Sequence, residues 1–252
     1  MRVPASMIDL HAHILPALDD GPQSDAAAVA LARAAVAHGT RAIATTSHVN
    51  RSFGLQPDDL AGARAALAVV LRAQGVPLEL LAGGEIAHRR LPELTDDDLR
   101  ALALGGGPFV LLECPLGGLD DLTPLVDDLH TRGFRVLLGH PERSPAFQRD
   151  PERLERLVAG GALAQVTTGA FTGDFGPIAQ RTALDMVDRE LVHVLASDTH
   201  DRVHRPPDLT AADELLGREQ REWMAAAAPA AIVAGDPLPD RPPPLTRAGR
   251  RR

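Results

Sequence analysis

The chain has 252 residues, of which 44% are hydrophobic, and a formal net charge of −8, with arginine in place of lysine throughout. This composition can bury one substantial core, and the acidic balance argues against nucleic-acid binding. No apolar run approaches the length that spans a membrane, and the N-terminus lacks a signal-peptide pattern. We therefore expect a soluble, cytoplasmic protein without membrane insertion.

Apolar, strand-like runs alternate with helical segments along most of the chain. Ser24 is a good N-cap for a helix that ends near Ala37, and Pro57 opens a helix that Gly75 ends. The alternation implies a parallel sheet. Strands are predicted near residues 7–13, 41–45, 78–82, 108–112, 134–138, 162–166 and 192–196, and helices near 24–37, 57–74, 96–103, 121–131, 151–159 and 176–189.

The alternation ends near residue 207, and a helical segment that contains Trp223 follows. From Gly235 the chain becomes rich in proline and arginine, with too little apolar content to fold. We therefore expect one domain over residues 7–234 and a disordered tail over residues 235–252.

Two histidines that are two residues apart, His11 and His13, end the first apolar run. On a strand, residues i and i+2 project from the same face, so both imidazoles can point at one centre. An isolated H-x-H motif has a high false-positive risk, but later strands also end in metal-capable side chains. These are His48, Glu85, Glu113, His140, Asp198 and His200.

The strand ends that carry these residues indicate where the site lies and which chemistry it performs. In a β/α barrel the carboxyl ends of the strands share one face, and six ends converging on one centre favour a closed barrel over an open sheet. Imidazoles mixed with carboxylates suit Mn²⁺, Fe²⁺ or Zn²⁺, and so many ligands favour two or three ions with Glu85 as a bridge. Such clusters generate hydroxide near neutral pH and stabilise in-line displacement at phosphorus, so we predict phosphoester hydrolysis.

Four motifs resemble those of the polymerase and histidinol phosphatase (PHP) superfamily. They contain His11 with His13, then Glu85, then residues 140–143, and finally residues 197–200. More narrowly, residues 9–16, 19–21, 168–176 and 205–207 resemble the bacterial PHP-type tyrosine-protein phosphatases of capsule and exopolysaccharide operons. The similarity extends from about Met7 to Trp223.

The resemblance implies an α/β fold, a single distorted (β/α)7 barrel of the PHP type, with three metal ions that are usually manganese. It assigns one ion to His11, His13, Glu85 and Asp198, a second to Glu85, Glu113 and His140, and a third to Asp20, His48 and His200. Arg143 and Arg205 match arginines that neighbour the phosphate, for which the planar guanidinium is suited. Ser47, Val49 and Asp201 depart from the family pattern, which concerns substrate contacts more than metal binding.

The implied substrate is phosphotyrosine on another protein, because this chain contains no tyrosine. The implied partner is an autophosphorylating tyrosine kinase of polysaccharide export, and a homo-oligomer remains open. Alternatives are another PHP phosphoesterase that acts on a small monoester such as histidinol phosphate, an amidohydrolase-type barrel, and a non-catalytic PHP module. Many amidohydrolases use a carboxylated lysine, which this chain lacks, and a degenerate module would have lost ligands.

A cysteine-dependent tyrosine phosphatase is a further alternative. Its nucleophile is a thiolate in a phosphate-binding loop, followed six positions later by an arginine. Here the single cysteine is Cys114, and Asp120 stands six positions later. A small, buried, unreactive thiol is therefore the favoured interpretation of Cys114.

Overall fold

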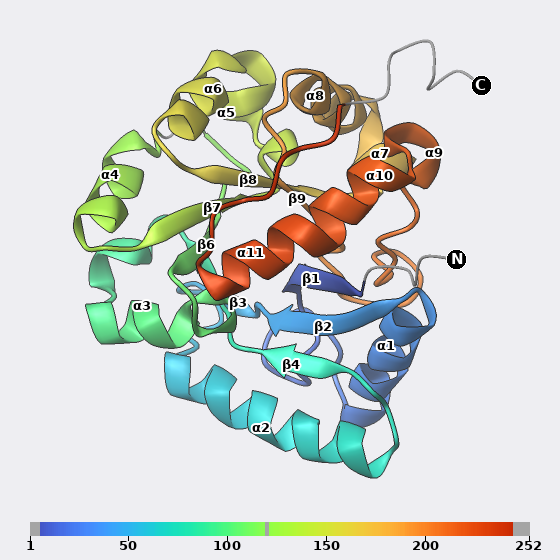
Figure 1. Cartoon of the computed structure of the whole chain (residues 1–252). Helices are drawn as coiled ribbons and strands as arrows, with labels where there is room; N and C mark the ends of the chain where they lie inside the picture. Colours follow the sequence, from blue (N-terminus) through green and yellow to red (C-terminus); the bar gives the residue numbers. More distant parts are fainter. Residues whose placement is uncertain (1–5, 119–120, 244–252) are drawn as a thin grey trace.

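The computed structural model describes residues 6–118 and 121–243, and within these ranges nine strands form two parallel sheets (Figure 1). Every paired strand runs parallel to its neighbour. The smaller sheet has the order β1 (Met7–Ala12), β2 (Thr40–Thr45) and β4 (Glu79–Leu81). The larger sheet has the order β3 (His48–Val49), β5 (Glu85–Ala87), β6 (Phe109–Glu113), β7 (Arg135–Gly139), β8 (Leu163–Thr167) and β9 (Val194–Ala196).

The closed seven-stranded sheet expected from the sequence is not found in the described residues. The reason is that two segments each form two strands: β2 is followed by β3, and β4 by β5, and the halves pair in different sheets. Gly84 lies at the second break, where a Cβ atom would stand 2.6 Å from Leu102 Cδ2, so a larger residue would not fit without movement. A parallel bridge between Ala12 and Thr199 connects β1 to the chain beyond β9.

Helices cover the outer faces of both sheets, with α1 and α2 beside the smaller one (Figure 1). The Ser24 side chain accepts a hydrogen bond from Ala27 N at 3.3 Å, which confirms the predicted start of α1. The helices are α1 (Asp25–Ala37), α2 (Pro57–Ala73), α3 (Asp96–Leu102), α4 (Thr123–Thr131), α5 (Pro145–Arg149), α6 (Glu152–Ala159), α7 (Thr168–Thr172), α8 (Gly176–Asp188), α9 (Asp213–Leu216), α10 (Arg218–Glu222) and α11 (Ala228–Ala234). Short 3₁₀ turns are η1 (Leu91–Glu93), η2 (Leu104–Gly106) and η3 (Pro141–Arg143), and η4 (Trp223–Ala227) is a π-helical segment between α10 and α11.

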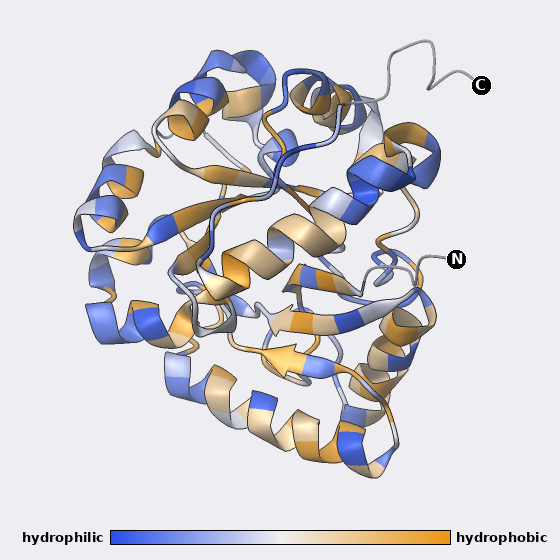
Figure 2. Ribbon diagram, in the orientation of Figure 1, coloured by the Kyte–Doolittle hydropathy of each residue, from blue (hydrophilic) through white to orange (hydrophobic). Residues whose placement is uncertain are grey.

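The strands separate two apolar regions, because successive side chains of a strand point to opposite faces. Val110 and Leu112 pack in the outer region against the helices, whereas Leu111 and Leu137 pack between the sheets with Leu10. Ile232 of α11 belongs to the inner region and closes it at one end. Figure 2 shows the outer helices with hydrophilic residues interspersed among hydrophobic ones. At the carboxyl ends of the strands the inner region becomes polar, and the candidate ligands lie there.

The segment after α11 differs from the predicted disordered tail as far as Pro243. Trp223 Nε1 donates a hydrogen bond to Pro239 O at 3.1 Å, and the Arg241 guanidinium lies 4.7 Å from the Trp223 ring centroid. Leu238 packs against both apolar regions. The composition of this segment did not predict these contacts, because they depend on two residues alone: Leu238 within the segment and Trp223 before it. Residues 244–252 lie outside the described ranges.

Among the described helices, none combines the length and the apolarity needed to cross a membrane.

Candidate metal centre

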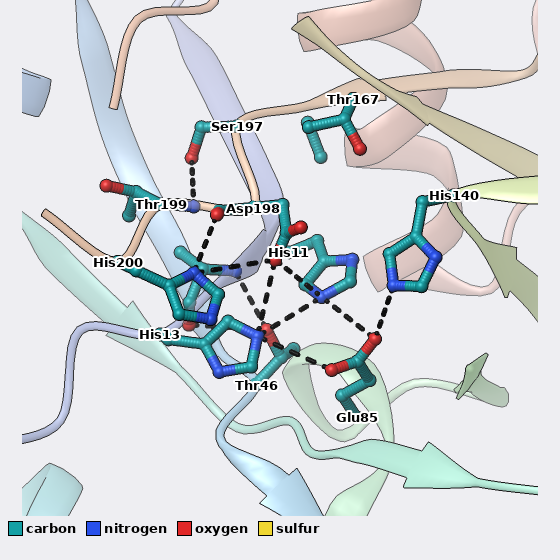
Figure 3. A network of polar contacts seen from close by, with 12 residues as sticks. His11, His13, Thr46, Glu85, His140, Thr167, Ser197, Asp198, Thr199 and His200 are labelled. Carbon is teal, nitrogen blue, oxygen red and sulfur yellow. Dashed lines mark hydrogen bonds and ion pairs between the residues drawn. The ribbon is translucent and has the colours of Figure 1, made fainter. Parts of the chain in front are cut away.

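The side chains predicted from the sequence as metal ligands come together at the carboxyl ends of the strands. Figure 3 shows how His11, His13, Glu85, His140, Asp198 and His200 point toward one another. The nitrogen and oxygen atoms of the predicted ligands form four overlapping groups, and within each group the atoms lie within 4.8 Å of one another. The groups are His13, Asp20, His48 and His200; His11, Glu85 and His140; His11, His13 and Asp198; and His48, Glu85 and Glu113. The structure therefore brings together all nine predicted ligands, although it groups Glu113 with His48 and Glu85 rather than with His140.

His11 in β1 and His13, the residue that follows β1, point at the same two carboxylates. His11 Nε2 lies 3.3 Å from Glu85 Oε1 and 3.4 Å from Asp198 Oδ1. His13 Nε2 lies 3.4 Å from Glu85 Oε2 and also 3.4 Å from Asp198 Oδ1. The two Nε2 atoms are themselves 3.4 Å apart, so the i, i+2 interpretation of the motif is correct in its geometry.

Hydrogen bonds at the other ring nitrogen fix how these imidazoles face the centre. His11 Nδ1 donates to Gln165 Oε1 at 2.9 Å, and His13 Nδ1 donates to Asp19 Oδ2 at 2.8 Å. His200 Nδ1 donates to the carbonyl oxygen of Asp198 at 2.9 Å. A proton held on Nδ1 leaves the Nε2 lone pair directed at the centre, as a metal ligand requires.

Two buried polar residues, Gln165 and Asp9, support the centre but were missed by the sequence reasoning. Gln165 Oε1 also accepts a hydrogen bond from His140 N at 3.3 Å, so one amide oxygen positions two histidines. Asp9 accepts hydrogen bonds from His11 N at 3.2 Å and Ser197 Oγ at 2.5 Å, which ties β1 to the last motif. Both residues interrupt apolar strands, and that interruption was the available signal.

Asp19, the residue before the candidate ligand Asp20, caps its own loop and also orients His13. Its Oδ1 atom accepts from Gly21 N at 3.0 Å, and its Oδ2 atom accepts from His48 N at 3.0 Å. Burial raises the pKa of Asp19, but the hydrogen bond and charge of His13, together with the hydrogen bonds from Gly21 N and His48 N, more than offset burial and hold the pKa well below the usual range. Asp19 therefore remains a carboxylate that links the loop before α1 to β3.

His140 and Asp198 are held by strained backbone. Their φ angles are 38° and 51°, in the left-handed region that non-glycine residues rarely adopt. Such conformations cost about 1–3 kcal/mol each and persist where the surroundings impose them. Asp198 N donates to His11 O at 2.8 Å, which holds the carboxylate over the end of β1.

The predicted phosphate arginines, Arg143 and Arg205, both reach the edge of the centre. Arg143 Nη1 donates to Asp198 Oδ2 at 2.8 Å, and Arg205 Nη1 approaches the same oxygen at 3.4 Å. Arg205 Nη2 also lies 3.6 Å from Asp20 Oδ2. The Arg143 guanidinium lies 4.3 Å from the Phe175 ring centroid, within the range of a cation–π interaction. The two guanidinium groups thus converge on one side of the candidate ligands.

The protonation behaviour of the centre fits a site for divalent cations. Burial lowers the pKa of His11, but Glu85 and Asp198 more than offset burial and raise it to about 9. Burial and the nearby Glu85 carboxylate raise the pKa of Glu113 to about 7. Glu85 Oε2 and His200 Nε2 are buried without a well-aligned hydrogen bond to the described residues, although charged groups surround them. Nitrogen and carboxylate donors packed in this way suit Mn²⁺, Fe²⁺ or Zn²⁺ better than protons.

Cys114 lies directly after β6 and is buried. Burial, followed by the Glu142 and Glu113 carboxylates, raises the pKa of its thiol well above the usual value. A thiol in this setting is a poor nucleophile, because attack requires the thiolate. The geometry therefore agrees with the sequence-based interpretation of an unreactive cysteine.

Comparisons with known proteins agree with this geometry. The family model for capsular polysaccharide synthesis proteins CpsB/CapC matches residues 7–228. The tyrosine-protein phosphatase YwqE of Bacillus subtilis (strain 168) is 36% identical over 202 residues, which cover 77% of this chain and 78% of YwqE. The putative tyrosine-protein phosphatase CapC of Staphylococcus aureus is 30% identical over 205 residues, which cover 79% of each chain.

Solved structures give the same result. One chain from the crystal structures of YwqE from Bacillus subtilis and CpsB from Streptococcus pneumoniae, described as unique metal-dependent tyrosine phosphatases, matches with a TM-score of 0.80 and 30% identity. This match covers 96% of the present chain and 100% of that chain. The phosphotriesterase from Mycobacterium tuberculosis shares the fold alone, with a TM-score of 0.59 and 15% identity over 91% of this chain and 94% of that one. The chain belongs to the CpsB/CapC family of capsular polysaccharide synthesis proteins.

Proposed function

We propose that this chain is a metal-dependent tyrosine-protein phosphatase that hydrolyses phosphotyrosine on another protein. The observation that carries the proposal is the convergence of nine nitrogen and oxygen donors on one centre with two guanidinium groups at its edge. Its relatives that bear the name tyrosine-protein phosphatase support the same activity. The absence of tyrosine from this chain means that the phosphotyrosine is supplied by a partner.

The centre would hold two or three divalent cations, which we propose are Mn²⁺, with Fe²⁺ and Zn²⁺ as alternatives. His11, His13, Glu85 and Asp198 would bind one ion, and Asp20, His48 and His200 another. The remaining ion would bind Glu85, Glu113 and His140. His140 Nε2 lies 2.9 Å from Glu85 Oε1. Such cations supply a nucleophile from water near neutral pH and stabilise the oxygens of the phosphoryl group.

Arg143 and Arg205 would bind the phosphate. Both contact Asp198 Oδ2, and their side chains are only partly buried, so each can turn a guanidinium N–H toward a phosphate oxygen placed above the ligands. Two planar guanidinium groups can hold the oxygens in a fixed orientation through charged hydrogen bonds. Phe175 lies against Arg143 and would limit how far that side chain swings away.

The protein substrate that we propose is a bacterial tyrosine kinase of polysaccharide export. The family description, capsular polysaccharide synthesis, supports this choice, because it associates the family with polysaccharide production. A small phosphate monoester such as histidinol phosphate is the alternative substrate, and a panel that contains both kinds of compound separates them.

The decisive experiment measures release of phosphate from a phosphotyrosyl peptide by metal-loaded, chelator-treated and Mn²⁺-restored protein. We expect activity only in the first and third samples, with histidinol phosphate turned over far more slowly. The matched variant Cys114→Ser should retain most of the activity, because the thiol is buried in the outer apolar region and its raised pKa makes it a poor nucleophile. Full activity after complete removal of metal, or a folded, metal-loaded and inactive Cys114→Ser variant, would overturn the proposal.

A further inference from the structure

The aromatic side chains of this chain are divided between the core and the edge of the candidate metal centre. The chain has six phenylalanines, one tryptophan and no tyrosine, and all seven aromatic residues lie within the described ranges. Two of them, Phe53 and Phe175, are not buried, and each lies against a residue of the centre. Apolar side chains that stay exposed and gather at one site are typical of contacts with a ligand. The buried ones are Phe109, Phe134, Phe147, Phe171 and Trp223.

The two exposed rings differ in what they cover. The Phe53 ring stacks on the His48 ring with 5.6 Å between the centroids, so it lies against a candidate metal ligand. The Phe175 ring centroid lies 4.3 Å from the guanidinium carbon of Arg143, so it lies against a side chain that we propose binds phosphate. Phe175 is therefore the aromatic residue beside the expected position of the phosphate.

Phe175 also forms a wall that two recesses share. One recess, of about 240 Å³, contains Arg143, and the other, of about 230 Å³, contains Arg205. Both arginines contact Asp198 Oδ2, so a phosphate that both hold would lie between the two recesses. The phenyl ring of phosphotyrosine is joined to phosphorus through a single oxygen, which brings that ring within reach of Phe175.

The chain before Phe175 fixes the position of its ring. Asp174 N donates a hydrogen bond to Gly169 O at 2.9 Å, and Thr172 Oγ1 donates to Asp174 Oδ2 at 2.7 Å. A Cβ atom at Gly169 would stand 3.0 Å from Phe175 Cε2, so the ring packs directly on the backbone of α7. A ring that is held in place before the substrate arrives loses little conformational freedom on binding.

We propose that Phe175 is a specificity-determining residue that packs against the phenyl ring of phosphotyrosine while Arg143 and Arg205 hold its phosphate. The inference rests on the proposed function, since it requires a phosphate ester at the metal centre. Packing between two aromatic rings favours an aryl phosphate over phosphoserine or phosphothreonine, which have no ring. The arginines then recognise the phosphate, and Phe175 recognises the alcohol from which the ester is made.

The test measures binding to the metal-loaded protein by isothermal titration calorimetry. The probes are phenylphosphonate and methylphosphonate, which have no ester bond to hydrolyse. The unaltered protein should bind phenylphosphonate about tenfold more tightly than methylphosphonate, which corresponds to about 1.4 kcal/mol. Phe175→Ala should abolish this preference by weakening phenylphosphonate binding, whereas Phe175→Tyr should keep it because the ring remains.

Methylphosphonate separates contact with the ring from an indirect effect through Arg143. It can use the phosphate contacts but not the aryl contact, so its affinity should be nearly the same in Phe175→Ala and in the unaltered protein. Val69→Ala is the control, because it also removes an exposed apolar side chain, on the outer helix α2, and should leave both affinities unchanged. In turnover, Phe175→Ala should lower kcat/KM for a phosphotyrosyl peptide about tenfold, mainly by raising KM.

Three results would overturn the role of Phe175. They are equal affinities for the two phosphonates in the unaltered protein, an equal weakening of both in Phe175→Ala, and a phenyl preference that persists in Phe175→Ala but disappears in Phe53→Ala. A metal-loaded protein that hydrolyses no phosphotyrosyl peptide would instead overturn the proposed function, while the calorimetry would still decide whether Phe175 contacts the ring.

Discussion

Glu85 lies at the meeting point of the candidate ligands. Its two carboxylate oxygens come within 3.4 Å of ring nitrogens of His11, His13, His48 and His140. Removal of this carboxylate would leave several cations or imidazolium groups without their shared counter-charge. A side chain in this position would bind more than one ion, so its removal should lower turnover more than the removal of an orienting residue does.

We therefore expect Glu85→Ala to lower turnover of phosphotyrosyl peptide by more than about 100-fold, since orienting residues alone cost about 10–100-fold. Metal analysis of the purified variant should show fewer ions per chain. Glu79→Ala is the matched control, because Glu79 is exposed on β4, away from the centre, and its loss should change neither quantity. Near-normal turnover in a folded Glu85→Ala variant would remove Glu85 from the centre.

The arginines should behave differently from the ligands. Arg143→Ala and Arg205→Ala should each keep their metal ions but lose about 1.5–3 kcal/mol of transition-state stabilisation, measured as kcat/KM on phosphotyrosyl peptide. Arg149→Ala, at the end of α5, serves as the control and should behave as the unaltered enzyme. Unchanged kcat/KM in both test variants would mean that the phosphate binds elsewhere.

The histidine, glutamate and Asp198 ligands could be predicted from the sequence because they end or follow apolar runs, and parallel strands bring such positions to one face. Asp20 lies in the loop after β1 and was predicted only from the family resemblance. Gln165 and Asp9 could not be found in this way, since their roles depend on distances across strands: Gln165 Oε1 meets His11 Nδ1 154 positions earlier. The sequence also could not predict that Glu113 lies in one group with His48, because this grouping depends on the pairing of β3 and β5 in the larger sheet.

At the level of elements, the long apolar strands β6, β7 and β8 begin and end within one residue of the predicted ranges. The short strands β3 and β5 were missed because two or three residues carry no periodic signal. The same reason applies to the five-residue helices α5 and α7. The closed sheet was expected because six strand ends converge on one centre, whereas the chain after β2 and after β4 forms the further short strands β3 and β5, which pair in the other sheet.

The entry to β9 contains a buried histidine whose protonation opposes folding. His193 Nδ1 accepts a hydrogen bond from Ala164 N at 3.2 Å, which requires the neutral ring. Burial, assisted by the Arg241 guanidinium, lowers the pKa of His193 to about 4. In the unfolded chain the same group takes up a proton near pH 6.5, so the unfolded state binds more protons below that pH.

Stability should therefore decrease as the pH falls from about 6.5 to about 4, and His193 should account for up to about 3 kcal/mol of that loss. His193→Asn keeps an acceptor near Ala164 N but does not titrate, so its free energy of unfolding should change less over this range. Urea unfolding at several pH values measures the difference, and His38→Asn, at a half-exposed histidine, is the control. An equal loss in His193→Asn and the unaltered protein would assign the acid sensitivity to other groups.

For the whole molecule, the candidate ligands come from strands of both sheets, so bound cations would hold the two sheets together. A ligand that binds only the folded state adds about 2.7 kcal/mol when its concentration is a hundred times its dissociation constant. We therefore expect the midpoint of thermal unfolding, Tm, to rise with free Mn²⁺ and to fall after chelation. Elemental analysis of the active sample should find two to three ions per chain.

The control for this experiment is the Glu85→Ala variant, whose Tm should respond less to Mn²⁺ than that of the unaltered protein. An active enzyme whose Tm does not depend on added or removed cations would contradict a metal centre that spans the two sheets.

The contacts between β1 and the last motif have a consequence for synthesis on the ribosome. Asp9 accepts a hydrogen bond from Ser197 N, 188 positions later, and Ala12 bridges to Thr199. The first strand therefore leaves the ribosome long before its final partners exist, and the centre cannot assemble until nearly the whole domain has been translated. A nascent chain, or a proteolytic fragment that ends before Ser197, would contain several of the histidines but lack the candidate ligands Asp198 and His200, so we expect it to be inactive.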